Sequence, residues 1–281
     1  MIRKSVISTV MAMAVFVGCG GSDKGLTQIT FHRNFDTAKA AAEKARKPMI
    51  IEFYADWSDY SDTLHEITFS DSIVISMSKD IVFVKIDAEE DTVAARRYGI
   101  AGYPTMVVTR PDGREIDRIW GFLTPNDFYN QVQLYLQGKE TLEDYVARLE
   151  DEPDNPEYLI LIGEKYAGRS QWPKAVEFYN RVLQLDLDNR RGLGSRAMAA
   201  IFDVHARAND FKATTDVIDE LIRRFPLSPE AEMAVAMKGY YTALNGDERG
   251  ALALFRQYLD KYPGGRQTWV LKRVADIEEK L

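Results

Sequence analysis

The spacing of apolar residues changes near residue 140, and this change divides the 281-residue chain into two parts. From about residue 27 to residue 137, short apolar runs typical of buried strands alternate with helical patterns. Beyond about Glu140 the spacing is purely helical. The sequence therefore predicts an α/β domain, with a mixed central sheet flanked by helices, followed by an all-α domain.

The first part offers candidates for every element of such a domain. Strands are expected over 28–32, 49–55, 81–86, 105–109 and 115–120, and helices over 35–46, 58–69, 71–78, 91–98 and 124–137. The run 49–55 is almost continuously apolar, as expected of a strand buried on both faces. Pro111, Asp112 and Gly113 favour a tight turn between the last two strands.

Four motifs then occur in a fixed order within this part. They are the runs 47–57, 68–71, 102–105 and 121–122, with sequences KPMIIEFYADW, TFSD, GYPT and GF. In this order they resemble thioredoxins, and most of all the C-terminal thioredoxin-like domain of the periplasmic thiol–disulfide interchange transporter family. The resemblance covers roughly residues 30–137 and implies a thioredoxin-like domain over 27–137.

The segment that carries redox chemistry in this family has no cysteine here. Redox-active members place Trp-Cys-x-x-Cys at a helix start, where the helix dipole lowers the pKa of the first thiol. The matching residues 57–61 read WSDYS, so Ser58 and Ser61 occupy the sulfur positions. The resemblance also makes Glu52 the buried acid beneath the active site. Because a hydroxyl cannot exchange disulfides, all three are interpreted as vestigial, and no catalytic residue is predicted.

Hydrolysis and metal binding are disfavoured for the same segment. A serine nucleophile needs a base, and His65 lies about two helical turns from Ser58, too far to reach it. Asp56, Asp59 and Asp62 are spaced by three residues but lack the glycine and terminal glutamate of a calcium loop. No metal or other cofactor is expected, and Ser58 is predicted to be an exposed serine at a helix start, with Ser58 or Asp59 capping that helix.

A peptide-binding function survives the loss of sulfur. Pro104, preceded by Tyr103, resembles the cis-proline of the fold, and the resemblance implies that its loop pairs with an extended substrate. Trp57, Tyr60, Tyr103 and Pro104 are therefore the candidate binding residues, and a protein or extended peptide is the expected partner. The alternative is that Pro104 is present only because the turn of the fold needs it.

The second part is predicted to contain three helical pairs and a final helix. Small residues recur at Gly163 and Ala175 in the first pair and at Gly239 and Ala251 in the third. This pattern resembles tetratricopeptide repeats, which implies a protein-binding surface. The expected boundaries are 138–155 for a linker with a short helix, and 156–281 for the repeats with a C-terminal capping helix.

The N-terminus has the pattern of a bacterial lipoprotein. A positive start and a short apolar run over 6–17 precede Cys19, the only cysteine in the sequence. Residues 16–19 (FVGC) resemble a lipobox, which implies that residues 1–18 are a signal peptide and that Cys19 carries lipid. Residues 19–26 then form a tether. Gly20, where some lipoproteins carry a retaining Asp, favours the outer membrane over the inner.

These features predict a lipid-anchored periplasmic scaffold protein rather than an enzyme. A net charge of −7 argues against nucleic acid as a partner. One alternative is a thioredoxin-type thiol–disulfide oxidoreductase in which Ser58 and Ser61 replace cysteines by engineering. Asp62, where family members commonly have lysine, favours natural loss instead. Another alternative is a chaperone-like holder of exported proteins.

Overall fold

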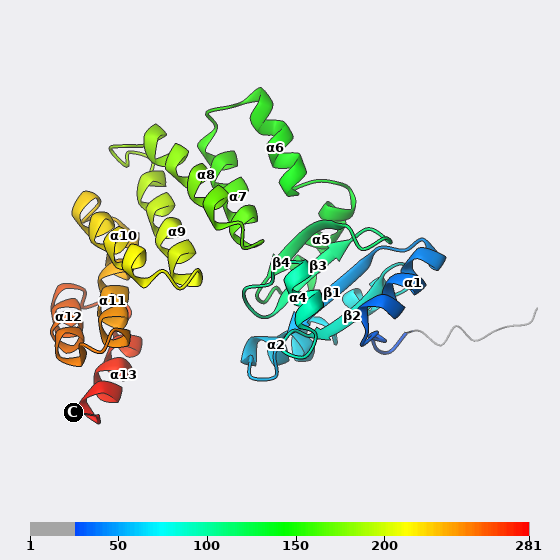
Figure 1. Ribbon diagram of the computed structural model, residues 1–281, viewed down its shortest axis with the longest axis horizontal. Coiled ribbons are helices and arrows are strands. Elements are labelled where there is room, and N and C mark those ends of the chain that lie inside the picture. The colour runs from blue at the N-terminus through cyan, green and yellow to red at the C-terminus, as the bar shows by residue number, and fades with distance from the viewer. Residues whose placement is uncertain (1–25, 281) are drawn as a thin grey trace, which may run out of the picture.

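The computed structural model describes residues 26–280. The predicted signal peptide, Cys19 and most of the predicted tether lie outside these residues. A sheet domain is followed by an array of helices that extends away from it (Figure 1). Within the described residues, no helix has the length and apolar character needed to cross a bilayer.

The sheet domain contains a mixed sheet, as predicted. Its strands are β1 (Met49–Tyr54), β2 (Val82–Asp87), β3 (Thr105–Thr109) and β4 (Glu115–Trp120). Its helices are α1 (Phe35–Ala45), α2 (Asp59–Thr63), the π-helix η1 (Leu64–Thr68), α3 (Ser72–Met77), α4 (Thr92–Arg97) and α5 (Pro125–Leu136). The strand order is β2-β1-β3-β4. β1 is parallel to β2 and antiparallel to β3, and β3 is antiparallel to β4.

Both faces of β1 are buried because helices cover both sides of the sheet. Ile50 packs with residues of η1, α3 and α5, whereas Ile51 and Phe53 pack with residues of α1 and α4. Successive side chains of a strand point to opposite faces, so Glu52 lies on the same face as Ile50. The alternation along β1 therefore directs this carboxylate toward η1.

Two elements differ from the expectation. Residues 28–32 do not form a strand, and only a single parallel bridge joins His32 to Val84 of β2. The chain leaves the sheet there because Asn34, two residues later, already caps α1 by accepting from the Thr37 backbone N–H. The helix expected over 58–69 is divided into α2 and the wider η1.

The second part consists of helices that pack on their neighbours in sequence. They are α6 (Leu142–Asp151), α7 (Pro156–Ala167), α8 (Trp172–Leu185), α9 (Leu193–Arg207), α10 (Phe211–Arg224), α11 (Pro229–Leu244), α12 (Glu248–Lys261) and α13 (Gln267–Glu278). Helices α7 to α12 form three pairs and α13 follows them, as the spacing predicts. α7, α9 and α11 lie on the side of the array nearer the sheet domain, and α8, α10 and α12 lie on the far side (Figure 1).

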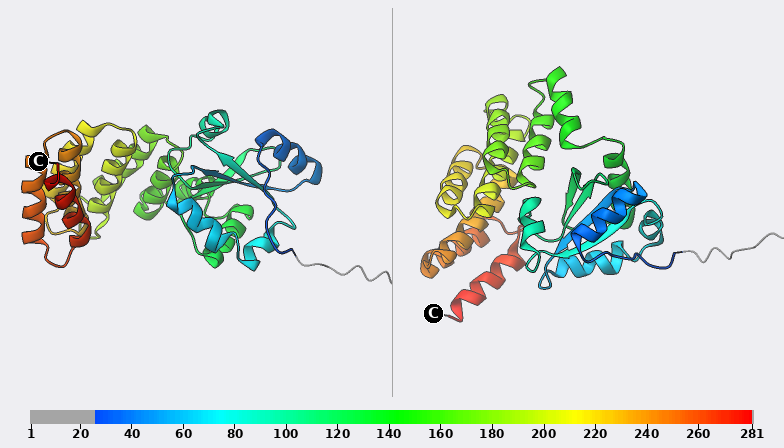
Figure 2. Two further views of the ribbon diagram at one scale, coloured as in Figure 1. Left: turned by 90° about the horizontal axis from the view of Figure 1, so that it is seen from below. Right: turned by 45° about the vertical axis from the view of Figure 1, so that its right-hand side comes forward.

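A buried ionic network joins the two parts. Asp117 of β4 has no exposed surface, and its carboxylate lies 3.0 Å from Arg169 Nη2 and 3.0 Å from Lys165 Nζ, at the end of α7. Arg118 donates from Nη1 to the Gly168 carbonyl at 2.7 Å. The views in Figure 2 show the array leaving the sheet domain from this side. Such contacts fix the orientation of α7 on β4.

Candidate functional site

Two large aromatic side chains face solvent at the start of α2, Trp57 in the preceding loop and Tyr60 within the helix. Trp57 is 68% exposed and Tyr60 is 67% exposed. The two serines between and beside them are buried, with Ser58 6% exposed and Ser61 2% exposed. The prediction of an exposed Ser58 is therefore wrong, because the turn into α2 folds this side chain inward.

Neither serine has the role of a helix cap. Ser58 occupies the N-cap position of α2, but its side chain accepts no capping hydrogen bond. The prediction that Ser58 or Asp59 caps this helix is therefore wrong as well. Ser61 Oγ is buried and has no hydrogen-bond partner among the described residues. Burying a hydroxyl without a hydrogen-bond partner costs free energy, whereas burying a less polar group in the same place would leave no hydrogen bond unmade.

The candidate binding residues come together only in part. The Tyr103–Pro104 peptide bond is cis, in agreement with the resemblance. The Trp57 ring packs edge-on against Tyr103, with 5.7 Å between centroids, and Trp57 Nε1 donates to Glu89 Oε1 at 3.0 Å. Burial raises the pKa of the Tyr103 phenol, and the nearby Glu89 carboxylate adds to this effect. Tyr60 has no aromatic partner within residues 26–280.

A further aromatic residue that sequence analysis missed lies at the cis-proline loop. Trp120 is 56% exposed at the end of β4. A Cβ on Gly102 would lie 2.7 Å from Trp120 Nε1, so the indole packs directly on the loop. The Arg207 guanidinium of α9 lies 4.4 Å from the centroid of the same indole, a cation–π contact. The helical array therefore reaches the edge of the candidate site.

Glu52 is held in a cluster that the sequence did not reveal. It has no exposed surface, and its Oε2 and Oε1 atoms lie 2.7 Å and 2.9 Å from His65 Nε2. Lys85 Nζ lies 2.8 Å from the same nitrogen. Nε2 can donate to Glu52 or accept from Lys85, but it cannot do both at once. The expectation of a buried Glu52 is confirmed, and its position on the Ile50 face explains how η1 supplies His65.

The hydrogen bonds of His65 give it no part in activating a serine. Within the described residues, Nε2 faces Glu52 and Lys85, and no hydrogen bond joins the ring to Ser58 or Ser61. The same residues contain no cysteine, since Cys19 lies outside them. No group of three or more metal-ligating side chains occurs among them. What this geometry offers is an exposed aromatic edge beside a cis-proline loop.

Comparison with known proteins assigns the first part of the chain. A family model described as a thioredoxin-like domain matches residues 35–135. This part of the chain is a thioredoxin-like domain. The mixed four-stranded sheet and the cis-proline loop belong to this domain.

The relatives of this domain include thiol–disulfide interchange proteins. Thiol:disulfide interchange protein DsbD of Campylobacter jejuni is 22% identical over 153 residues, covering 47% of this chain and 27% of that protein. Thioredoxin Y, chloroplastic, of Oryza sativa is 28% identical over 105 residues, covering 37% of this chain and 61% of that protein. The chain thus spans about a quarter of the DsbD protein and less than two thirds of the thioredoxin.

Solved thioredoxin structures also align with part of this chain, and the alignments cover most of each thioredoxin. A mutant thioredoxin from Halobacterium salinarum aligns with 40% of this chain and 93% of its own, at 20% identity and a TM-score of 0.33. A thioredoxin from Thermus thermophilus aligns with 40% of this chain and 90% of its own, at 21% identity and a TM-score of 0.36.

Proposed function

We propose that this protein is a binding protein of the bacterial cell envelope, whose thioredoxin-like domain holds an extended polypeptide without redox chemistry. The observation that carries this proposal is the replacement of both sulfur positions by Ser58 and Ser61, beside the exposed aromatic rings of Trp57 and Tyr60. A hydroxyl cannot exchange disulfides, but the backbone of a loop such as that at Pro104 still pairs with an added strand.

The charge around this edge favours a cationic partner segment. Asp56, Asp59 and Asp62 are exposed in and beside the loop, and Glu89 is exposed next to Trp57. None of these carboxylates forms an ion pair within residues 26–280. Exposed indole and phenol rings attract lysine and arginine side chains. An extended segment with basic and apolar residues therefore complements the edge in both charge and surface.

The rest of the chain would attach the protein to a membrane and supply a second surface that binds a partner. Lipid on Cys19 would anchor the protein, in the outer membrane facing the periplasm given Gly20 at the next position. The helical pairs resemble tetratricopeptide repeats and would supply a protein-binding surface. Two weak binding modules on one chain raise the effective affinity for a partner that engages both.

Three measurements test this function. Protein lacking residues 1–19 should not accelerate the reduction of insulin by dithiothreitol, and a rate above that of dithiothreitol alone would overturn the proposal. A labelled, capped peptide of alternating arginine and leucine should bind, with binding weakened about fivefold by Trp57→Ala and by moderate salt. Leu187→Ala, which removes a 62% exposed apolar side chain in the helical array, outside the thioredoxin-like domain, is the control. Palmitate labelling of the full chain should be lost in Cys19→Ala.

A further inference from the structure

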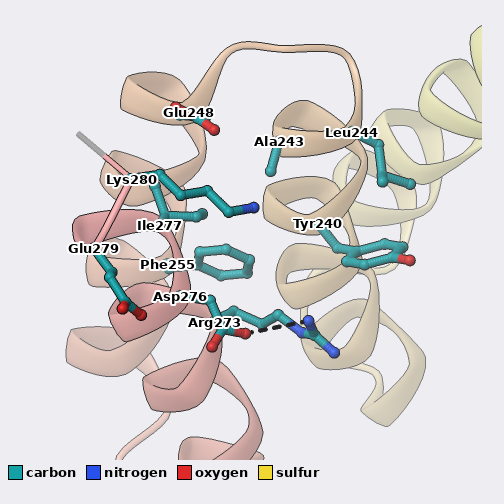
Figure 3. A pocket seen from close by; sticks show the side chains of 10 residues that line it. All are labelled: Tyr240, Ala243, Leu244, Glu248, Phe255, Arg273, Asp276, Ile277, Glu279 and Lys280. Atoms are coloured by element: carbon teal, nitrogen blue, oxygen red, sulfur yellow. Dashed lines mark hydrogen bonds and ion pairs between the residues drawn. The ribbon is translucent and has the colours of Figure 1, made fainter.

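A groove between α11 and α13 contains two adjoining pockets. The first has a volume of about 450 Å³ and is lined by Met233, Ala236, Met237, Tyr240, Arg266, Trp269 and Arg273. The second has a volume of about 530 Å³ and lies toward the end of α13 (Figure 3). Tyr240 and Arg273 line both pockets. The two pockets therefore adjoin at Tyr240 and Arg273, and the groove has one pocket on each side of Arg273.

Arg273 presents an oriented positive charge where the pockets meet. Its guanidinium carbon lies 5.5 Å from the Trp269 ring centroid and 5.8 Å from the Tyr240 ring centroid. Its Nε is buried and has no hydrogen-bond partner among residues 26–280. Its ion pair with Asp276 is long, at 3.4 Å (Figure 3). The aromatic rings hold this side chain in place, while much of its hydrogen-bonding capacity is unused.

The first pocket combines positive charge with apolar walls. Arg266 is exposed at the N-cap position of α13, and no carboxylate of the described chain forms an ion pair with it. The positive end of the α13 dipole lies at the same place, where Tyr258 accepts from the Arg266 backbone N–H and donates to the Glu232 carboxylate. No acidic residue lines this pocket, and Met233 and Met237 supply adaptable apolar surface. An anionic group attached to an apolar one suits this environment.

The second pocket has an apolar floor and a mixed rim. Phe255 is fully buried and Ile277 is 6% exposed, and both line the pocket together with Leu244. The pocket is also lined by Glu248, Asp276, Glu279 and Lys280 (Figure 3). Three carboxylates beside one ammonium disfavour an anionic group in this pocket, so the anionic group of a ligand belongs in the first pocket. The floor accommodates a large apolar side chain.

We propose that this groove binds an internal segment of a partner protein in which an acidic side chain precedes or follows a large apolar one. The carboxylate pairs with Arg273 and Arg266, and the apolar side chain enters the pocket over Phe255 and Ile277. An internal segment is favoured over a chain terminus because the groove continues on both sides of Arg273. This site rests on the protein-binding surface proposed for the helical pairs and is separate from the edge at Trp57, so failure of one does not decide the other.

Fluorescence anisotropy with the full mature chain tests this site. The probe is a capped hexapeptide with one glutamate between leucine and phenylalanine, and its glutamine counterpart is the matched control. The glutamate probe should bind at least about tenfold more tightly than the glutamine probe, since a charge-assisted bond is lost in the latter. Arg273→Met, which keeps the stem packing, and Arg266→Gln should each weaken binding by a similar factor. Arg190→Gln, at an exposed ion pair outside the groove, should leave it unchanged.

Other occupants of the groove would give different results in these experiments. Equal affinity for the glutamate and glutamine probes would overturn the site. Binding only of a probe with a free C-terminal carboxylate would show that the groove takes a chain terminus, and would contradict an internal segment as its occupant. A concentration-dependent dimer in sedimentation that Arg273→Met or Arg266→Gln abolishes would assign the groove to a second copy of this chain and overturn the partner. Arg266 is exposed, so Arg266→Gln remains informative even if Arg273→Met unfolds.

Discussion

Glu52 and His65 form a pair in which the carboxylate is fully buried and the imidazole is 25% exposed. Replacing His65 by alanine leaves the Glu52 carboxylate with no exposed surface and without its imidazole partner. We expect His65→Ala to lower the free energy of unfolding by about 1–2 kcal/mol, because Glu52 loses a hydrogen-bond partner but Lys85 stays in the same cluster. Denaturant unfolding measures this change.

The double variant and a surface histidine complete this test. Glu52→Gln combined with His65→Ala should be less destabilised than the sum of the single variants, because no buried charge remains. His205→Ala should change stability by less than about 0.5 kcal/mol, since His205 lies 4.0 Å from the exposed Asp210. Additive effects of Glu52→Gln and His65→Ala would contradict the pairing.

The contrast between Glu52 and His65 marks what the sequence can predict at single positions. Glu52 is placed by a motif and by the alternation of a strand, both of which are local. His65 reaches it only because η1 packs across the Ile50 face of the sheet. Their separation of 13 residues in the sequence does not indicate that the two side chains meet. The same holds for Trp120, whose contacts with Gly102 and Arg207 join three separate segments.

Within the helical pairs, two glycines allow an aromatic ring of the paired helix to pack against the backbone. A Cβ on Gly163 would lie 2.5 Å from the ring of Tyr179, and one on Gly239 would lie 2.7 Å from the ring of Phe255. Both rings are essentially buried. We expect Gly163→Ala and Gly239→Ala each to destabilise the protein by about 1–3 kcal/mol through overpacking, despite the better helix propensity of alanine.

A matched glycine isolates this effect. A Cβ added to Gly264 would have no atom within 4 Å, and the φ of this residue is not positive, so Gly264→Ala should leave the thermal midpoint nearly unchanged. Calorimetry of the three variants measures the difference. Equal midpoints for Gly239→Ala and Gly264→Ala would contradict close packing of α11 on α12.

Asp186 stabilises the start of α9 in a pH-dependent way. Burial raises the pKa of its carboxyl, but the backbone N–H groups of Leu193, Arg191 and Gly194 donate to it and the net effect is a lowered pKa. A lowered pKa in the folded state means that the contribution to stability is present above the unfolded value and is lost as the pH falls through the folded value.

Asp186→Asn tests this contribution across pH. At pH 7 the variant should lose about 1 kcal/mol of stability, the usual value of a helix-capping side chain. The difference from the native protein should shrink as the pH falls below about 4, the ordinary aspartate pKa. Urea unfolding at about pH 7 and about pH 3.5, on either side of that value, measures both differences. A difference that does not change with pH would mean that the carboxylate charge plays no part.

The order of helices and strands was predicted more fully than their ends. Apolar periodicity is strong in β1 and in the helical pairs, so both were found from the sequence alone. The segment 28–32 also has a strand-like composition. It forms only one bridge because it lies beside β2 immediately before the cap of α1. The sequence cannot show this, since the outcome depends on where the chain must turn.

The contact between the sheet domain and the helical array could not be predicted from sequence patterns. In the sequence, Asp117 is one polar residue in the alternating pattern of a strand. Lys165 and Arg169 are basic residues at a helix end, where such residues are common. Their meeting depends on the path of α6, which places the end of α7 against β4 (Figure 1). Burial lowers the pKa of the Lys165 ammonium, and the Asp117 carboxylate opposes this effect.

This network predicts that Asp117 holds the two parts in one orientation. Asp117→Ala leaves Lys165 without its carboxylate partner and Arg169 with Glu115 alone, and should cost roughly 3 kcal/mol because both cations are largely buried. The array should then move relative to the sheet domain, because this carboxylate is the centre of the ionic contact between them. Small-angle X-ray scattering should show an increased radius of gyration. Asp188→Ala, which breaks an exposed pair with Arg190, should leave the scattering unchanged. An unaltered radius in Asp117→Ala would show that the orientation depends instead on contacts such as Arg207 on Trp120.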